Sequence, residues 1–352
     1  MLVVAVSCRS GGEATEPVAT GLNVDAGATT TSVESAPVET TPAESSPAET
    51  APAETAPAVD NQFGPGDHVV EVSHGGRARR YIIHVPESVV PRAPVMMALH
   101  GGGGTGEQFQ DENGLDAVSD REGFIAVYPE GSGVLPNRLH TWNSGDSCCG
   151  FAFDRNIDDV GFLRAVIEDL GARMSVDPER MYITGHSNGA MMAYRMAAEA
   201  SDVVTAVIPV AGAMDIAEFA PSAKVAVLHI HSLDDPRALY DGGEGPPFPG
   251  TERIVNHESV VSGIERWAEV NGCGAEPAVS QSIAGAGDDE GQTAELLVWS
   301  GCAEGAEVEH LRLSGSGHGW PGVEVRSVVQ DFLGPPTTLV DASEEAWAFA
   351  DR

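Results

Sequence analysis

From residue 67 onward, short apolar segments alternate with segments whose apolar positions recur at helical spacing. Several apolar segments are continuous runs, which is typical of parallel strands buried on both faces. Strands that alternate with helices predict an α/β fold, with a mostly parallel central sheet and helices on both faces. The predicted strands are His68–Val72, Arg79–Val85, Pro94–Leu99, Gly123–Tyr128, Arg180–Thr184, Val203–Val210, Lys224–His231, Ala294–Trp299 and Val308–Leu313. The predicted helices are Ile157–Met174, Ser187–Glu199, Glu258–Val270 and a last helix opened by the capping box Asp341–Glu344.

The first 62 residues have a different pattern. Residues 9–62 are rich in Ala, Pro, Glu and Thr, a composition that cannot offset the entropy of ordering and predicts a disordered tether. Residues 1–8 end a short apolar run at Cys8 and resemble the remnant of a lipoprotein signal with Cys8 as the lipidated residue, although an incidental cysteine is the alternative. This run is too short to span a membrane. We therefore expect one folded domain, residues 63–352, behind the tether.

The charge of the chain narrows its partners. Its 352 residues include 53 acids and 19 bases, with a net charge of −34, and Lys224 is the single lysine. Such a surface repels phosphate backbones, which argues against nucleic-acid binding. A solvated acidic exterior is the plain interpretation, and steering of a cationic ligand is the alternative.

One stretch places a serine between a predicted strand and a predicted helix. The strand runs into Gly185-His-Ser187-Asn-Gly189, and a helix-forming sequence follows. In a Gly-x-Ser-x-Gly turn of this kind the serine is exposed on a strained turn, and the helix N-terminus faces any anion that forms nearby. The motif alone arises by chance in roughly one chain in three of this composition, so its context carries the argument. We predict that Ser187 is a nucleophile.

A serine nucleophile needs a base and donors for the oxyanion. His318 follows the predicted strand Val308–Leu313 in a glycine-rich loop and is the predicted base. The run His100–Gly104 follows another strand, where the second oxyanion donor is expected. We therefore predict an oxyanion hole formed by the N–H groups of Gly102 and Asn188.

The acid should lie between the serine and the histidine in the sequence, at the end of a strand. Asp235 follows the strand Lys224–His231 and is preferred to its neighbour Asp234. Asp215 and Asp241 are weaker candidates because they lie off a clear strand end.

The histidines of the same strand allow a second interpretation. His229 and His231 alternate on one strand face beside two carboxylates, but a zinc site requires three protein ligands. We interpret His229 as a core residue, His231 as a brace for the acid loop, and His310 as an ordinary strand residue. No metal or cofactor is expected.

Four cysteines remain once Cys8 is set aside. An even number in an exported protein implies disulfides, with three possible pairings. Cys273 ends a predicted helix and Cys302 follows a predicted strand, so we favour this pair. Cys148 and Cys149 could form a vicinal disulfide or stay reduced.

Several motifs occur together in the order of a known family. The sequence from residue 67 to the end resembles the poly(3-hydroxybutyrate) depolymerase family, which overlaps with the feruloyl and acetylxylan esterases of carbohydrate esterase family 1, and it is most similar to actinobacterial lipoproteins. The resemblance implies an α/β-hydrolase fold, a Ser187–Asp235–His318 triad, and a place in the substrate cleft for Trp320 and Trp142, with packing as the alternative role of both tryptophans. The motifs are His100–Gly104, Trp142 with Cys148–Gly150, Asp158–Phe162, Gly185–Gly189, Asn271–Cys273 and Gly317–Pro321.

The family's acid motif differs here. It usually reads His-Gly-Thr-x-Asp-Pro-x-x-Pro-Tyr, whereas this chain has Ser232-Leu233 for Gly-Thr and Arg237-Ala-Leu239 before Tyr240. The resemblance still implies Asp235 as the acid, but it does not define the shape of the pocket around it.

The predicted activity is hydrolysis of carboxylic esters at the cell surface or outside the cell. Hydroxyalkanoate esters are the first substrate class and feruloyl or acetyl esters the second, and a lipid on Cys8 would be the membrane contact. The alternatives are a non-catalytic binding lipoprotein and an acyltransferase of the mycolyl-transfer type.

Overall fold

The computed structural model describes residues 61–352 except 136–137, 147, 248–253 and 324–326. The chain divides into two units, Met1–Thr55 and Ala56–Arg352, and all of the described residues belong to the second. Cys8 and residues 9–60 of the expected tether lie outside the described residues. The last two tether residues already bond to the folded unit, since Gln62 N–H donates to Arg173 O at 2.8 Å and Asn61 Oδ1 accepts from Ser175 N–H at 2.7 Å. In the described part, the helices are too short or too polar to cross a bilayer.

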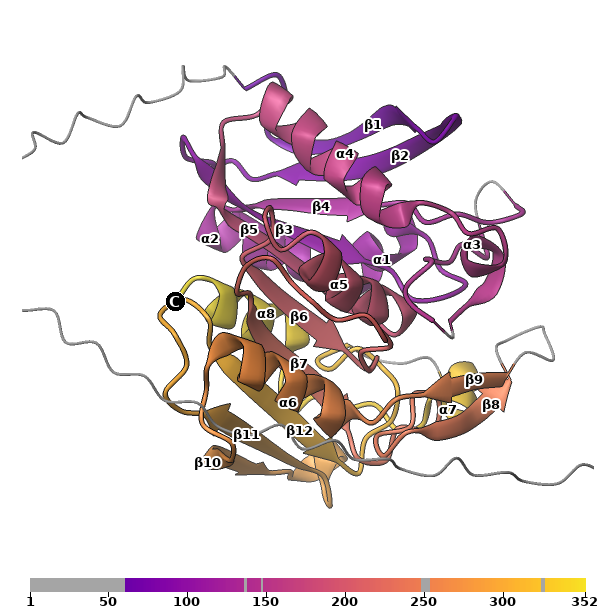
Figure 1. The fold of residues 1–352 in the computed structure, drawn as a ribbon, viewed down its shortest axis with the longest axis vertical. Coiled ribbons are helices and arrows are strands. Elements are labelled where there is room, and N and C mark those ends of the chain that lie inside the picture. Colours follow the sequence, from indigo (N-terminus) through magenta and orange to yellow (C-terminus); the bar gives the residue numbers. More distant parts are fainter. Residues whose placement is uncertain (1–60, 136–137, 147, 248–253, 324–326) are drawn as a thin grey trace, which may run out of the picture. The chain divides into compact units, whose positions relative to one another are not determined.

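A ten-stranded sheet runs through this unit (Figure 1). Its six central strands are parallel, and two antiparallel strands extend it at each edge. Four of the central strands, β3, β4, β6 and β7, are buried at every position, which confirms the interpretation of the continuous apolar runs. In spatial order the strands are β1 (Gly66–His74), β2 (Arg77–Val85), β4 (Ile125–Pro129), β3 (Ala93–Leu99), β5 (Val176–His186), β6 (Ala206–Val210), β7 (Ala226–Ser232), β12 (Val308–Ser314), β11 (Thr293–Trp299) and β10 (Pro277–Ala284).

Helices cover both faces of the sheet (Figure 1). One face carries α4 (Asp159–Arg173), α5 (Asn188–Glu199) and α6 (Val260–Asn271), and the other carries α1 (Gly106–Asn113), α2 (Leu115–Glu122) and α8 (Ala342–Ala350). Short helices α3 (Gly150–Asp154) and α7 (Ser327–Leu333) lie in loops, and β8 (Gly243–Pro247) pairs with β9 (Ile254–His257) as a separate ribbon. Asp341 accepts the N–H groups of Ser343 and Glu344, so it caps α8 as the sequence predicts.

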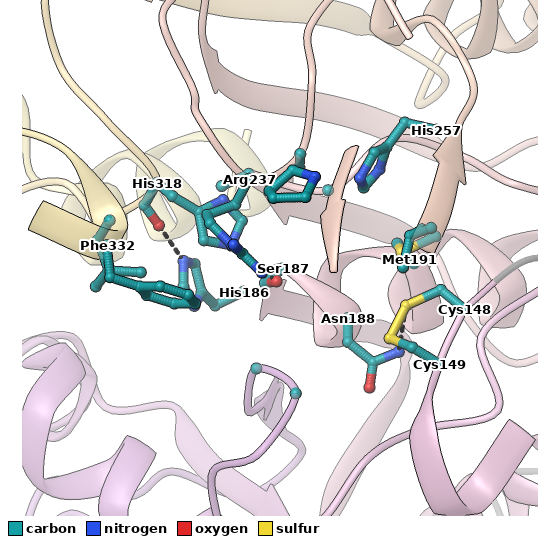
Figure 2. A pocket seen from close by; sticks show the side chains of 18 residues that line it. Cys148, Cys149, His186, Ser187, Asn188, Met191, Arg237, His257, His318 and Phe332 are labelled. Atoms are coloured by element: carbon teal, nitrogen blue, oxygen red, sulfur yellow. Dashed lines mark hydrogen bonds between the residues drawn. A yellow bond between two sulfur atoms is a disulfide. The ribbon is translucent and has the colours of Figure 1, made fainter. Parts of the chain in front are cut away.

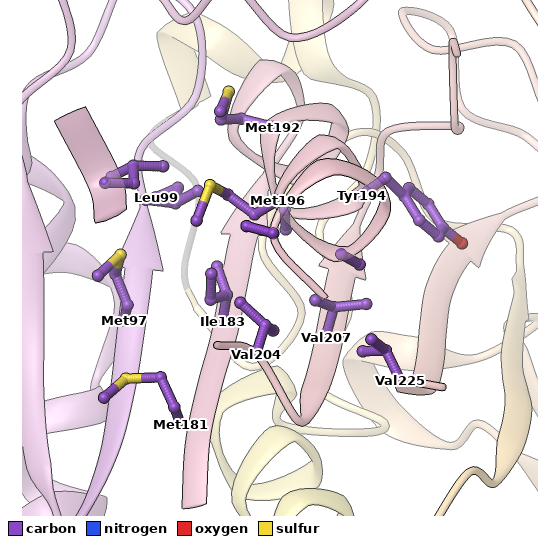
Figure 3. Packing of buried hydrophobic residues seen from close by; sticks show 14 of the residues in the cluster. Met97, Leu99, Met181, Ile183, Met192, Tyr194, Met196, Val204, Val207 and Val225 are labelled. Carbon is purple, nitrogen blue, oxygen red and sulfur yellow. The ribbon is translucent and has the colours of Figure 1, made fainter. Parts of the chain in front are cut away.

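The core between the sheet and α5 combines methionine side chains with branched aliphatic ones (Figure 3). Met97 and Ile183 extend from the sheet, and Met192 and Met196 meet them from α5, each without exposed surface. This packing fixes α5 against β5, and therefore fixes the turn that joins them.

Several elements differ from the sequence prediction. Helices α1, α2, α3 and α7, the β8–β9 ribbon, the 3₁₀ turn Gly287–Asp289 and edge strand β10 were not expected. Edge strand β10 is mostly exposed and has no alternation of apolar and polar residues, and α1 and α2 bury three residues each. Such elements leave little periodic signal because tertiary contacts, and not an apolar face, hold them.

Candidate active site

Ser187 occupies the turn between β5 and α5. Its backbone has φ 54° and ψ −118°, a conformation that costs on the order of 1–3 kcal/mol in a residue with a side chain. A Cβ on Gly185 would lie 2.5 Å from Gly189 O, and a Cβ on Gly189 would collide with Leu99 O. Both glycines of the motif are therefore required where the turn passes close to itself and to β3.

Ser187, His318 and Asp235 form one hydrogen-bonded chain at the carboxyl ends of β5, β12 and β7. His318 Nε2 lies 2.9 Å from Ser187 Oγ, and His318 Nδ1 lies 2.7 Å from Asp235 Oδ2. Because an ionised carboxylate only accepts hydrogen bonds, Nδ1 carries the proton and Nε2 accepts from the serine hydroxyl. The three residues predicted from the sequence are thus brought into contact.

Asp235 is buried but held in its ionised form. Its Oδ1 accepts the N–H groups of Arg237 and Ala238 at 2.7 and 2.9 Å. Burial acts to raise the pKa of Asp235, but the charge and hydrogen bond of His318 and the hydrogen bond of His231 outweigh burial and hold this pKa well below its usual range. The carboxylate can therefore keep His318 in the tautomer that faces the serine.

Asp234, the alternative acid, faces a different part of the loop. It is exposed, and its Oδ2 accepts Gly315 N–H at 2.7 Å and Ser314 Oγ–H at 3.3 Å. Asp234 therefore braces the loop that carries His318, while Asp235 contacts the imidazole itself.

Two further histidines lie close to His318. His186 Nε2–H donates to His318 O at 2.6 Å (Figure 2). Burial and, secondarily, the nearby His318 lower the pKa of His186 to about 4. Burial and His318 likewise lower the pKa of His257, on β9, to about 4. Both rings are therefore neutral at pH 7.

The segments that carry Gly102 and Asn188 are joined by Trp142. Gly102 and Asn188 line the same pocket as Ser187. Trp142 Nε1–H donates to His100 O at 2.9 Å, and Trp142 N–H donates to Asn188 Oδ1 at 2.7 Å. Trp142 has no exposed surface, so its prediction as a cleft residue is wrong. Its buried indole bonds to the start of the glycine turn and its main chain bonds to Asn188, so Trp142 links that turn to the start of α5.

Trp320 is also not part of the pocket lining. It is 7% exposed and packs edge-on against Phe109, with ring centroids 5.2 Å apart. After His318 the chain turns toward the α8 face, where Ala342 N–H donates to Pro321 O at 3.0 Å. The turn carries the indole into the core, which corrects its prediction as a cleft residue.

A cavity of about 120 Å³ lies beside Ser187 (Figure 2). One side is an apolar wall formed by Cys148, Cys149, Met191 and Val255, which contact one another and are each at most 5% exposed. In Figure 2 the labelled members of the apolar wall lie on the opposite side of Ser187 from His318 and Phe332. The remaining lining includes Arg237, Pro246, His257 and Leu333.

Sequence reasoning missed the apolar wall. Met191 follows Ser187 by four residues, so helical spacing placed it one turn further along the same face of α5. Val255 and His257 come from the unexpected β9, and local sequence offered no signal for them.

Both pairs of cysteines form disulfides. The predicted Cys273–Cys302 bridge is confirmed, and its members have a sequence separation of 29. Cys148 and Cys149 form the vicinal disulfide, one of the two states left open by the sequence.

Within the described ranges, one group has the spacing of metal ligands: Asp67, His84 and Asp116, whose candidate ligand atoms lie within 4.8 Å of one another. His84 Nδ1 already bonds to Asp67 Oδ1 at 2.7 Å, and Asp116 Oδ1 accepts Tyr128 O–H at 2.6 Å. These residues do not line the Ser187 pocket. His229 and His231, the two histidines of the zinc alternative, instead bond to each other at 3.0 Å.

Comparison with known proteins agrees with this architecture. A family model described as "Esterase PHB depolymerase" matches residues 80–271. The NocK protein of Nocardia uniformis subsp. tsuyamanensis, which is named as an esterase, is 30% identical over 268 residues, or 72% of this chain and 73% of NocK. Poly(3-hydroxyalkanoate) depolymerase C of Paucimonas lemoignei is 27% identical over 253 residues, or 68% of this chain and 58% of the depolymerase. Among solved structures, an acetyl xylan esterase from Aspergillus awamori has a TM-score of 0.51 at 14% identity, over 75% of this chain and 97% of the esterase.

The mostly parallel sheet, its helices and the serine turn are those of an α/β hydrolase. Within that class, the chain belongs to the esterase PHB depolymerase family, whose model matches more than half of it. It is therefore a carboxylic ester hydrolase, as the sequence resemblance implied.

Proposed function

We propose that this enzyme hydrolyses short-chain carboxylic esters, foremost 3-hydroxyalkanoate esters, through Ser187, His318 and Asp235. The observation that carries the proposal is the unbroken hydrogen-bonded chain from Asp235 through His318 to Ser187 Oγ. This arrangement supplies a nucleophile, a base that accepts its proton, and an acid that fixes the tautomer of the base.

The reaction would proceed in two acyl-transfer steps. His318 Nε2 takes the proton of Ser187 as Oγ attacks the ester carbonyl, and the N–H groups of Gly102 and Asn188 stabilise the oxyanion. His318 then gives the proton to the departing alkoxide, which leaves an acyl-serine. Water, activated by the same imidazole, releases the acid and regenerates the serine.

The side of the pocket assigned to each half of the ester follows from this chemistry. The departing oxygen must lie within reach of His318 Nε2, because that atom donates its proton. The acyl chain must therefore point away from His318, toward the apolar wall. A cavity of about 120 Å³ bounded by Met191, Val255 and a disulfide suits a short aliphatic acyl group.

The cavity beside Ser187 also bears on which acyl groups of the alternative substrates can bind. An acetyl group fits the same space, so acetyl esters of polysaccharides are the second candidate. A feruloyl group carries an aromatic ring, and hydrolysis of methyl ferulate tests whether the pocket admits it. The depolymerase relative, whose name specifies poly(3-hydroxyalkanoate), supports the first candidate.

We further propose that the enzyme is extracellular, held at the cell surface by a lipid on Cys8 and the tether of residues 9–62. Two disulfides in the folded unit support an oxidising compartment.

The test is hydrolysis of p-nitrophenyl acetate, butyrate and octanoate, 3-hydroxybutyrate oligomers, and methyl ferulate by wild type and Ser187→Ala. We expect activity on acetate, butyrate and the oligomers that the variant lacks. Equal rates in both proteins would mean that Ser187 is not the nucleophile and would favour the non-catalytic binding lipoprotein. Acyl transfer to an added sugar in preference to water would favour the acyltransferase.

A further inference from the structure

The proposed catalytic acid has a second histidine partner. His231 Nε2 lies 3.3 Å from Asp235 Oδ2 and 2.8 Å from Ala238 O. Both neighbours only accept hydrogen bonds, so His231 Nε2 must carry a proton. His231 is 1% exposed and does not line the Ser187 pocket, and it therefore meets the substrate only through Asp235.

Two more buried side chains continue the line behind His231. His229 Nε2 lies 3.0 Å from His231 Nδ1, and Tyr194 Oη lies 2.9 Å from His229 Nδ1. His229 and His231 point to the same face of β7 because they are two residues apart, and Tyr194 reaches them from α5. In the direction that leads toward Asp235, His229 Nε2–H donates to His231 Nδ1, and His229 Nδ1, which then carries no proton, accepts from the tyrosine hydroxyl.

We propose that Tyr194, His229 and His231 form a one-way hydrogen-bond relay that positions Asp235 and weakens its hold on protonated His318. Each member donates toward Asp235, and the tyrosine hydroxyl fixes the tautomers of both rings. The inference rests on the proposed function, in which Asp235 and His318 serve Ser187. All three relay members are positioning residues, since they act through Asp235.

Burial keeps His229 and Tyr194 uncharged. Burial, and then the neighbouring histidines, lower the pKa of His229 well below its usual value, and burial raises the pKa of Tyr194. Other titratable or charged groups also face the relay, Asp235 or His318. They are His186 on β5, Arg237 and Tyr240 in the loop after β7, His257 on β9, and His310 and Arg312 on β12.

The relay has a defined effect on the pH dependence of catalysis. His318 Nδ1–H donates to Asp235 Oδ2 at 2.7 Å, and His231 Nε2–H, which donates to Ala238 O, lies 3.3 Å from the same oxygen and also stabilises its negative charge. Without the His231 donor, the carboxylate interacts more strongly with the imidazolium of His318, which then loses its proton at a higher pH. The acid limb of the kcat/KM profile, which reports the free enzyme's base, should move upward.

The experiment measures that limb with p-nitrophenyl butyrate in three relay variants. His231→Leu should move it upward by about one pH unit and lower kcat at nearly unchanged KM. His231→Gln, which keeps an N–H donor, should restore most of the wild-type profile. Tyr194→Phe frees the tautomers of the relay and should shift the limb in the same direction by less, and it should add nothing in the His231→Leu background.

A matched control joins the loop after β7 to the neighbouring strand β12. Tyr240 O–H lies 3.0 Å from His310 Nε2, a second buried tyrosine–histidine pair whose other ring nitrogen donates to the main-chain oxygen of His229. Tyr240→Phe removes an equivalent hydrogen bond outside the relay and should leave the acid limb in place. An equal shift in Tyr240→Phe, or lower rates without a shift in the relay variants, would overturn the inference.

Failure of the proposed function has a separate readout. NMR titration of the His318 ring in substrate-free protein follows the same proton without any turnover. If the His318 titration shifts in the relay variants but activity survives in Ser187→Ala, the relay is retained and the proposed mechanism is rejected. Unshifted titration in an enzyme that requires Ser187 would reject the relay alone.

Discussion

The apolar wall should set the length of the acyl group that the enzyme accepts. Met191 is 4% exposed and lines the cavity one helical turn after Ser187. Met191→Ala removes Cγ, Sδ and Cε, which makes room for about two further methylene groups of the substrate. Each buried methylene contributes about 0.8 kcal/mol, so two contribute about 1.6 kcal/mol, or about 15-fold in kcat/KM.

The assay compares p-nitrophenyl hexanoate with p-nitrophenyl butyrate. We expect wild type to prefer butyrate and Met191→Ala to raise the hexanoate-to-butyrate ratio of kcat/KM by about 15-fold. Met192→Ala is the matched control, because Met192 is fully buried in the α5 core and does not line the cavity (Figure 3). It should lower the free energy of unfolding by about 2–5 kcal/mol and leave the ratio unchanged. An unchanged ratio in Met191→Ala, or the same rise in Met192→Ala, would refute the assignment of this wall to the acyl group.

Three further predictions concern the carboxylate of Asp235, the Cys273–Cys302 disulfide and the buried histidines. Asp235→Asn should lower kcat by about 10⁴-fold, because the amide no longer holds the proton of His318 on Nδ1. Asp234→Asn should lower kcat far less in the same ester assay. Replacing Cys273 and Cys302 by alanine should lower the free energy of unfolding by about 3–4 kcal/mol, because the disulfide closes a loop with a sequence separation of 29. Urea titration measures this loss of stability, and kcat should stay unchanged. Lowering the pH below 6.5 should destabilise the fold, because histidines in the unfolded chain bind protons while the buried rings stay neutral. The free energy of unfolding should fall by up to about 1.4 kcal/mol per pH unit for each ring. Urea midpoints that stay constant from pH 7 to 5 would contradict this. Burial is the main cause that lowers the pKa of each of these rings to about 3 or 4: His100, His186 and His310.

The elements that position the serine could be predicted because their signals are local. Buried segments of the parallel strands leave apolar runs in the sequence, and each of the three residues of the hydrogen-bonded chain follows a parallel strand directly or lies in the loop beyond it. Ser187, Asp235 and His318 were therefore predictable by their order and their strand ends.

The pocket could not be predicted in the same way. Its apolar wall combines a loop, a helix and the short strand β9, which meet only in the folded chain. The two tryptophans illustrate the limit. A sequence motif places an indole near the site, but whether it faces solvent or core depends on partners such as His100 O, which accepts Trp142 Nε1–H.

The hydrogen bonds of the site also make it a reporter of complete folding. The bond between Asp235 and His318 joins positions 83 residues apart at the ends of the adjacent strands β7 and β12, and the bond between His318 and Ser187 joins positions 131 residues apart across β6 and β7. No fragment of the sheet can bring these ends together, and parallel strands form slowly because long loops must close first. During refolding from urea, ester hydrolysis should therefore return with the last phase of native structure, after helix content has recovered. The recovery of catalytic activity would therefore report the time at which the sheet is fully assembled.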